Sequence, residues 1–126
     1  MAFTPLSIAA QFGNVQEVLA LIEAGADINV CNHIGWTPLY MAAGNGHDGV
    51  VKALIAANVD IDKTDDIGWT PLLKATEYGR ETTVQILIEA GADINKASYS
   101  GMTPLINAVL KGRETILKML SKAGAV

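Results

Sequence analysis

Apolar residues at helical spacing fill a short segment in each 33-residue stretch of the chain. In the first stretch these residues are Val15, Val18, Leu19, Leu21 and Ile22, and in the third they are Val84, Ile86, Leu87 and Ile88. Apolar residues three or four positions apart line one face of an α-helix, so each segment predicts an amphipathic helix. We expect these helices to end at the residues best suited to a left-handed cap, namely Gly25, Asn58, Gly91 and Gly124.

A shorter helix is predicted before each of these segments by the sequence Thr-Pro-Leu. The motif begins at Thr4, Thr37, Thr70 and Thr103, each 33 residues after the last. A threonine hydroxyl can accept a hydrogen bond from a free N–H of the first helical turn. Proline suits the next position because its missing N–H would have no partner there. These helices are expected to end at Gly13, Gly46, Gly79 and Gly112.

A tight turn is predicted before three of the four motifs. The stretch Asp65-Asp66-Ile67-Gly68 has Asp at the first turn position and Gly at the fourth, and the same slots hold Asn32 with Gly35 and Ser98 with Gly101. Each unit is then a turn, a helix, a turn, a helix and an extended return. Two short helices cannot bury their apolar faces alone, so we expect neighbouring units to stack. The predicted repeats are 1–31, 32–64, 65–97 and 98–126.

This unit resembles the ankyrin repeat. The matching residues are Gly35-Trp36-Thr37-Pro38-Leu39, Ala42-Ala43, Gly46-His47 and Gly25-Ala26-Asp27-Ile28-Asn29, with counterparts in the other repeats. The resemblance implies one all-α ankyrin-repeat solenoid over 1–126, built of helix-turn-helix pairs with β-hairpin-like connecting turns. In the family, Thr-Pro-Leu usually continues with a His that ties neighbouring repeats. Here the slot holds Ser7, Tyr40, Leu73 and Ile106, and we expect apolar contacts to replace the His bonds at Leu73 and Ile106.

The fourth repeat carries polar residues in slots that are apolar in earlier repeats. Ser121 takes the slot of Ile22, Ile55 and Ile88, and Asn107 takes the slot of Ile8 and Met41. A terminal repeat needs a polar outer face because no further repeat covers it. We therefore expect a C-terminal cap and a complete protein of four repeats, with truncation of a longer array as the alternative.

The resemblance also implies that a protein partner binds the concave side, along the hairpin tips and the first helices. The slot before each capping threonine holds Phe3, Trp36, Trp69 and Met102, which either form a ladder of binding anchors or only brace the stack. The expected partner-binding residues are His33, Ile34, Trp36, Asp66, Ile67, Trp69, Glu77, Tyr78, Tyr99 and Met102. We expect this face to be acidic around Asp65, Asp66 and Glu77. Its partner would then present apolar side chains flanked by Lys or Arg.

Composition and charge narrow the function. The net charge of -4 argues against nucleic-acid binding, which needs a concentrated basic surface. No stretch approaches the ~18 continuous apolar residues of a membrane helix. Cys31 is the only cysteine, so no internal disulfide can form and a cytoplasmic location is expected. Half of the residues are hydrophobic, which predicts a folded protein, and we expect it to be a monomer.

The residues give little support for catalysis or for a cofactor. Cys31 and His33 lie close in sequence, but nothing fixes them as a nucleophile and its base, and a zinc site needs further ligands. We therefore predict a non-catalytic protein-binding module, an adaptor, inhibitor or effector, that needs no cofactor or metal. The alternatives are an engineered or reconstructed scaffold without a natural partner, and an enzyme or metal protein centred on Cys31 and His33.

Overall fold

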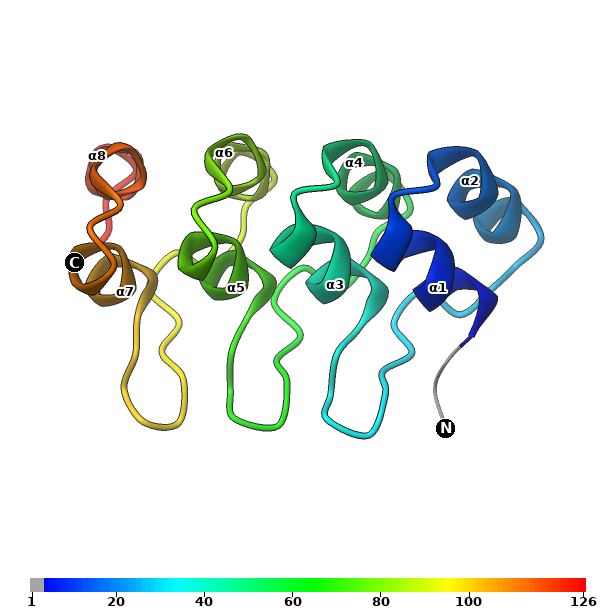
Figure 1. Cartoon of the computed structure of the whole chain (residues 1–126), viewed down its shortest axis with the longest axis horizontal. Coiled ribbons are helices and arrows are strands. Elements are labelled where there is room, and N and C mark those ends of the chain that lie inside the picture. The colour runs from blue at the N-terminus through cyan, green and yellow to red at the C-terminus, as the bar shows by residue number, and fades with distance from the viewer. Residues whose placement is uncertain (1–3) are drawn as a thin grey trace.

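Paired helices stacked side by side make up the molecule (Figure 1). The computed structural model describes residues 4–126, which leaves Phe3 of the predicted ladder outside the described residues. The described residues form the helices α1 (Pro5–Phe12), α2 (Val15–Glu23), α3 (Pro38–Asn45), α4 (Asp48–Ala56), α5 (Pro71–Glu77), α6 (Glu81–Glu89), α7 (Pro104–Leu110) and α8 (Glu114–Lys122). They form no strand. The predicted all-α solenoid of helix-turn-helix units is confirmed.

The helices form two rows, and the hairpin loops project from one of them. Odd-numbered helices make the first row and even-numbered helices the second, and each loop extends beyond the first row (Figure 1). The core lies where the rows meet, and its fully buried leucines include Leu39, Leu54, Leu72 and Leu87. Burying one such side chain contributes about 1.5–3 kcal/mol. Leu19, expected on the apolar face of α2, is 47% exposed, and its slot holds the exposed Lys52 and Lys118 in α4 and α8, so this position faces solvent in several repeats.

The Thr-Pro-Leu motifs begin the first-row helices as predicted. Each capping threonine accepts a hydrogen bond of 3.1 Å from the backbone N–H three residues later. The glycines expected at the helix ends all have positive φ. Asn58 (φ 64°) has the same conformation and is the only residue other than glycine to do so within 4–126. The predicted caps are therefore confirmed at both ends of the helices.

Side chains on the extended returns tie each repeat to the next. Asn29 Oδ1 accepts a hydrogen bond of 2.9 Å from the Asp60 N–H, and Asp62 Oδ1 accepts one of 3.0 Å from the Asp93 N–H. Asn95 Oδ1 accepts one of 3.0 Å from the Val126 N–H. The acceptors lie 33 residues apart, so they form a return-loop ladder along the array. Each rung couples only nearest neighbours, as expected of a solenoid.

The slot of the family's histidine is filled differently in each repeat. The Tyr40 hydroxyl donates a hydrogen bond to Asp65 Oδ2, whereas Leu73 is fully buried, which agrees with the apolar contact predicted there. Ser7 is buried and its hydroxyl donates to the Thr4 carbonyl. The apolar contact predicted at Ile106 is wrong, because Ile106 is 45% exposed and the described residues provide no later repeat to cover it.

The polar cap predicted for the fourth repeat is incorrect for α7. Asn107 is 2% exposed, and its Nδ2 donates to Glu77 Oε1 of the third repeat, so it does not face outward. The exposed side of α7 instead carries Ile106, Val109 and Leu110. On α8, Ser121 is exposed as expected, and Lys118 and Lys122 are exposed beside it. The polar outer surface is therefore restricted to the second-row helix of this repeat.

Candidate functional site

A side chain at the first turn position organises each hairpin. Asn32 Oδ1 accepts from the N–H groups of Ile34 (3.1 Å) and Trp36 (2.9 Å). Asp65 Oδ1 accepts from those of Ile67 (3.0 Å) and Trp69 (2.9 Å). Asn and Asp favour such turns because their short side chains reach the backbone two residues on. The predicted turns are confirmed. The hydrogen bonds to the Trp36 and Trp69 N–H groups fix the backbone position from which each indole ring extends.

Neighbouring hairpins are joined by backbone hydrogen bonds, which place their tips in a row. The Asp66 N–H donates to the Ile34 carbonyl at 3.2 Å, and the Tyr99 N–H donates to the Ile67 carbonyl at 3.1 Å. Gly35 permits this approach, since a Cβ there would lie 2.8 Å from Asp65 Cα. Ile34, Ile67 and Tyr99 are exposed, as predicted for the two isoleucines. The hairpin tips therefore present apolar side chains to solvent.

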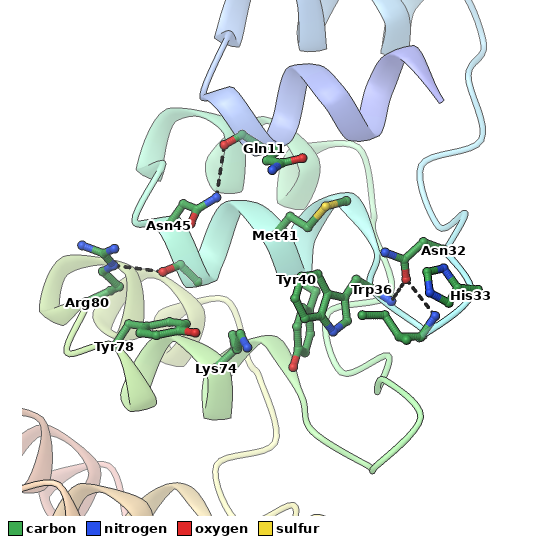
Figure 2. Close-up of a pocket in the computed structure, with 12 residues that line it drawn as sticks. Gln11, Asn32, His33, Trp36, Tyr40, Met41, Asn45, Lys74, Tyr78 and Arg80 are labelled. Carbon is green, nitrogen blue, oxygen red and sulfur yellow. Dashed lines mark hydrogen bonds between the residues drawn. The ribbon is translucent and has the colours of Figure 1, made fainter. Parts of the chain in front are cut away.

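An aromatic cluster surrounds a lysine ammonium where the second and third repeats meet. We define the cluster as Trp36, Tyr40 and Tyr78. Trp36 stacks on Tyr40 with ring centroids 5.5 Å apart. Lys74 Nζ lies 4.9 Å, 5.4 Å and 5.0 Å from the ring centroids of Trp36, Tyr40 and Tyr78, within range of cation–π attraction. Figure 2 shows Lys74 between Tyr78 and the Trp36–Tyr40 pair.

Buried polar contacts hold the Tyr40 ring of this cluster in place. Tyr40 is 2% exposed, and its hydroxyl lies 2.6 Å from Asp65 Oδ2. Burial first, and then the hydrogen bond to Asp65, raises the pKa of Tyr40 well above its usual range. The phenol therefore remains protonated and donates to the carboxylate. Since Trp36 stacks on this fixed ring, the wall of the site is rigid on the side of the second repeat.

Two open clefts adjoin at the aromatic cluster. The first encloses about 470 Å³ and the second about 340 Å³, and both are lined by the cluster, Ile34 and Lys74. The first extends toward α1, where Gln11, Met41 and Asn45 line it, and toward Arg80 on the other side (Figure 2). The second extends along the next hairpin past Asp66, Ile67 and Trp69. We call the two clefts together the aromatic groove.

The charges of the groove differ from those expected. Asp65 is 6% exposed and its oxygens accept the hydrogen bonds described above, so it does not act as a surface charge. Glu77 accepts from Asn107 Nδ2 at 2.8 Å and pairs with Lys111 at 3.3 Å. The Asn107 bond is the main reason that the pKa of Glu77 is lowered. Of the three acidic residues expected on this face, Asp66 alone is exposed and without such a partner.

The structure brings most of the predicted partner-binding residues together. The first cleft is lined by His33, Ile34, Trp36 and Tyr78. The second is lined by Ile34, Trp36, Asp66, Ile67, Trp69, Glu77 and Tyr78. Tyr99 and Met102, on the following hairpin, line neither cleft. The predicted ladder is therefore concentrated in the second and third repeats, where Trp36 both braces Tyr40 and borders the groove.

Sequence reasoning missed the residue at the centre of the groove, Lys74. Its slot holds Met41 in the repeat before, and Lys74 is not among the predicted partner-binding residues. The available signal was its spacing from Tyr78, because residues four apart on a helix share one face. Gly44 makes room for both side chains, since a Cβ there would lie 3.0 Å from Lys74 Cγ and 3.8 Å from Tyr78 Cδ2.

The two residues considered for other chemistry are Cys31 and His33. Cys31 is half-buried with a free thiol, and His33 is exposed at a hairpin tip. Within residues 4–126, no group of three or more His, Cys, Asp or Glu side chains is placed to hold a metal ion. No helix over the same residues has the length and apolar character needed to cross a membrane.

Comparison with known proteins identifies the family. A family model described as ankyrin repeats (3 copies) matches residues 2–65 and 49–126. Among curated proteins, no sequence matches this chain. Because the family matches together span nearly the whole sequence, and because the helices, caps and hairpins recur with the same period, the chain belongs to the ankyrin-repeat family.

Proposed function

We propose that this protein is a non-catalytic module that binds a protein partner through its aromatic groove. Ankyrin repeats generally mediate protein–protein interaction, and the family is typically non-catalytic. The observation that carries the proposal is the continuous run of aromatic and apolar side chains along the groove. Ile34, Ile67 and Tyr78 are 38%, 60% and 51% exposed and lie beside the half-buried Trp36 and Trp69.

Exposed apolar surface is unfavourable in water, so a partner that covers the groove gains binding free energy. Contiguous apolar patches on a protein commonly mark interaction sites. Aromatic anchors held in a fixed position contribute most to such interfaces because they bury a large area and lose little conformational freedom. The hydrogen bonds of Asn32, Asp65 and Tyr40 supply that fixed position here. The groove is thus ordered before a partner arrives.

The role in the cell is part of the same proposal. The module acts as an adaptor, inhibitor or effector that works by covering its partner's surface, as a monomer and without a cofactor. Its partner is a protein and not a nucleic acid, which agrees with the net charge of -4. The single cysteine, Cys31, is consistent with a cytoplasmic location.

A capture experiment with matched variants tests the proposal. The bait is the whole chain, compared with an Ile67→Ala/Tyr78→Ala variant in which both changed side chains are exposed in the groove. The control is Leu19→Ala/Val109→Ala, which removes apolar side chains that are exposed outside the groove. Circular dichroism establishes that all three chains are folded.

The proposal predicts that a protein captured by the native chain is retained by the control and lost by the groove variant. Loss from the control but not from the groove variant would place binding outside the groove. Equal capture by all three chains would likewise contradict a role for the groove.

A further inference from the structure

The ammonium group of Lys74 is held in the groove without a protein acceptor. Among residues 4–126, the Lys74 ammonium makes neither a hydrogen bond nor an ion pair, and its close neighbours are the three rings of the aromatic cluster. Ring faces attract a cation but do not accept its N–H bonds as a carboxylate does. The group therefore retains donors that point into a cleft.

Two further groups border the first cleft, and one of them, Arg80, adds a second positive charge. Arg80 Nε donates to the Gly44 carbonyl at 3.0 Å, which fixes the guanidinium at the edge of the cleft and leaves its terminal nitrogens available. His33 borders the cleft from the hairpin. None of the residues that line this cleft is Asp or Glu. A chain with a net charge of -4 thus has a cleft whose only full charges are cationic.

The acidic groups nearby border the second cleft and not the first, although Glu77 interacts electrostatically with Lys74. Asp65 is buried and occupied by Tyr40 and the hairpin, and Glu77 is directed to Asn107 and Lys111. Asp66 remains exposed, but it borders the second cleft and not the first. The electrostatic preference of the first cleft is therefore set by Lys74 and Arg80.

We infer that the first cleft binds an Asp or Glu side chain of the partner protein, with the carboxylate on the Lys74 ammonium and an adjacent apolar side chain on Tyr78 and Met41. This inference rests on the proposed function and specifies the chemistry of its partner. It reverses the sign of charge expected from the sequence, where Asp65 and Glu77 favoured a partner rich in Lys or Arg. A carboxylate would complete the hydrogen bonding of an ammonium that the aromatic rings already hold in position.

A selection from a displayed library of random peptides tests the inference. The baits are the native chain, Lys74→Met, Lys52→Met and Tyr78→Ala, each checked for its fold by circular dichroism. Lys74→Met removes the charge in a slot where the preceding repeat already has Met41. Lys52→Met removes a charge from an exposed position of α4, outside both clefts. The selected peptides are then synthesised with Asp or Glu and with Asn or Gln, and their affinities are measured by calorimetry.

The expected peptides carry Asp or Glu beside Phe, Leu or Trp. They should bind Lys74→Met about tenfold or more weakly than they bind the native chain, as the loss of a charge-assisted hydrogen bond implies. Replacing the peptide carboxylate by an amide should remove the difference between these two chains. Lys52→Met should bind like the native chain.

Other outcomes separate failure of the inference from failure of the proposed function. Peptides that require Tyr78 but carry no acidic residue, or that bind Lys74→Met as tightly as the native chain, would overturn the inference and leave the groove as a binding site. Peptides that bind Tyr78→Ala unchanged would contradict both, because they would occupy another surface. Failure to enrich any peptide would also count against both.

Discussion

The Tyr40 hydroxyl lies 2.6 Å from Asp65 Oδ2 and joins helix α3 to the hairpin of the following repeat. Tyr40 occupies the slot in which the family usually has histidine. The second and third repeats are therefore still joined by a hydrogen bond from this slot, with a tyrosine hydroxyl as the donor. The other carboxylate oxygen, Oδ1, accepts from the Ile67 and Trp69 N–H groups. One buried carboxylate therefore connects a helix, a hairpin and the wall of the aromatic groove.

Removing this hydroxyl should destabilise the protein. In Tyr40→Phe, Asp65 Oδ2 loses its donor while remaining buried, which costs about 1–3 kcal/mol of the free energy of unfolding. Urea denaturation followed by circular dichroism measures the change. Tyr78→Phe is the matched control, because the Tyr78 side chain is 51% exposed, and its free energy should change by less than about 0.5 kcal/mol. Equal losses in both variants would show that the Tyr40–Asp65 bond contributes nothing specific.

The same bond predicts a loss of stability at alkaline pH. The pKa of Tyr40 is raised above its ordinary value of 10.0 in the folded protein, so above that pH the unfolded chain releases a proton that the folded chain retains. The stabilising contribution is complete below pH 10.0 and decreases as the pH rises, by about 1.4 kcal/mol per pH unit.

Urea denaturation of the native chain and Tyr40→Phe across this alkaline range measures the effect. The free energies of unfolding of the two proteins should converge as the pH rises, because only the native chain has this tyrosine to titrate. Parallel curves would mean that the Tyr40 pKa does not differ between the folded and unfolded states.

Local chemistry explains why most of the fold could be predicted from the sequence. The cap at Thr37 and the left-handed turn at Gly46 depend on residues within one helical turn, and both recur every 33 residues. The burial of Asp65 depends on Tyr40, 25 residues earlier, and the pairing of Glu77 depends on Asn107, 30 residues later. No periodic pattern encodes such contacts, so both carboxylates were expected at the surface.

Asn58 provides a test of the helix-end geometry. Its φ of 64° is disfavoured for residues with a Cβ, although asparagine tolerates it better than most. Asn58→Gly should leave the melting temperature nearly unchanged or raise it slightly. Asn58→Val should lower the stability by roughly 1–2 kcal/mol, because a β-branched residue is strained in this region. Calorimetric melting of the two variants checks the difference, and identical melting temperatures would refute it.

The return-loop ladder can be tested at its middle rung. Asp62→Ala removes the acceptor of the Asp93 N–H and should cost about 0.5–1.5 kcal/mol. Asp62→Asn keeps an Oδ1 atom in the same place, as Asn29 and Asn95 do in their repeats, and should behave like the native chain. Hydrogen exchange at the Asp93 amide gives a local readout. Faster exchange in the alanine variant alone is expected, and equal acceleration in both would exclude the side-chain acceptor.

Less of the candidate site than of the fold could be predicted from the sequence. The slot of Trp36 and Trp69 and the exposed Ile34 and Ile67 follow from the repeat register, which sets where each residue points. The role of Lys74 does not, because it depends on rings from two repeats meeting around one ammonium. Contacts between side chains of neighbouring repeats therefore determine the electrostatics of the groove, and these contacts do not follow the repeat pattern.

The Tyr40–Asp65 bond also means that the repeats are not interchangeable parts. If the second and third repeats exchanged places, Tyr40 would face Ser98, whose hydroxyl already serves the Met102 N–H. Leu73 would face Asn32 in the same arrangement, and Asp65 would face Ser7. Reordering the repeats would keep the periodic caps and turns, but the Tyr40–Asp65 contact would be lost. The Tyr40–Asp65 pair, like the Glu77–Asn107 pair, therefore depends on the order of the repeats, and so does the position of the groove along the array.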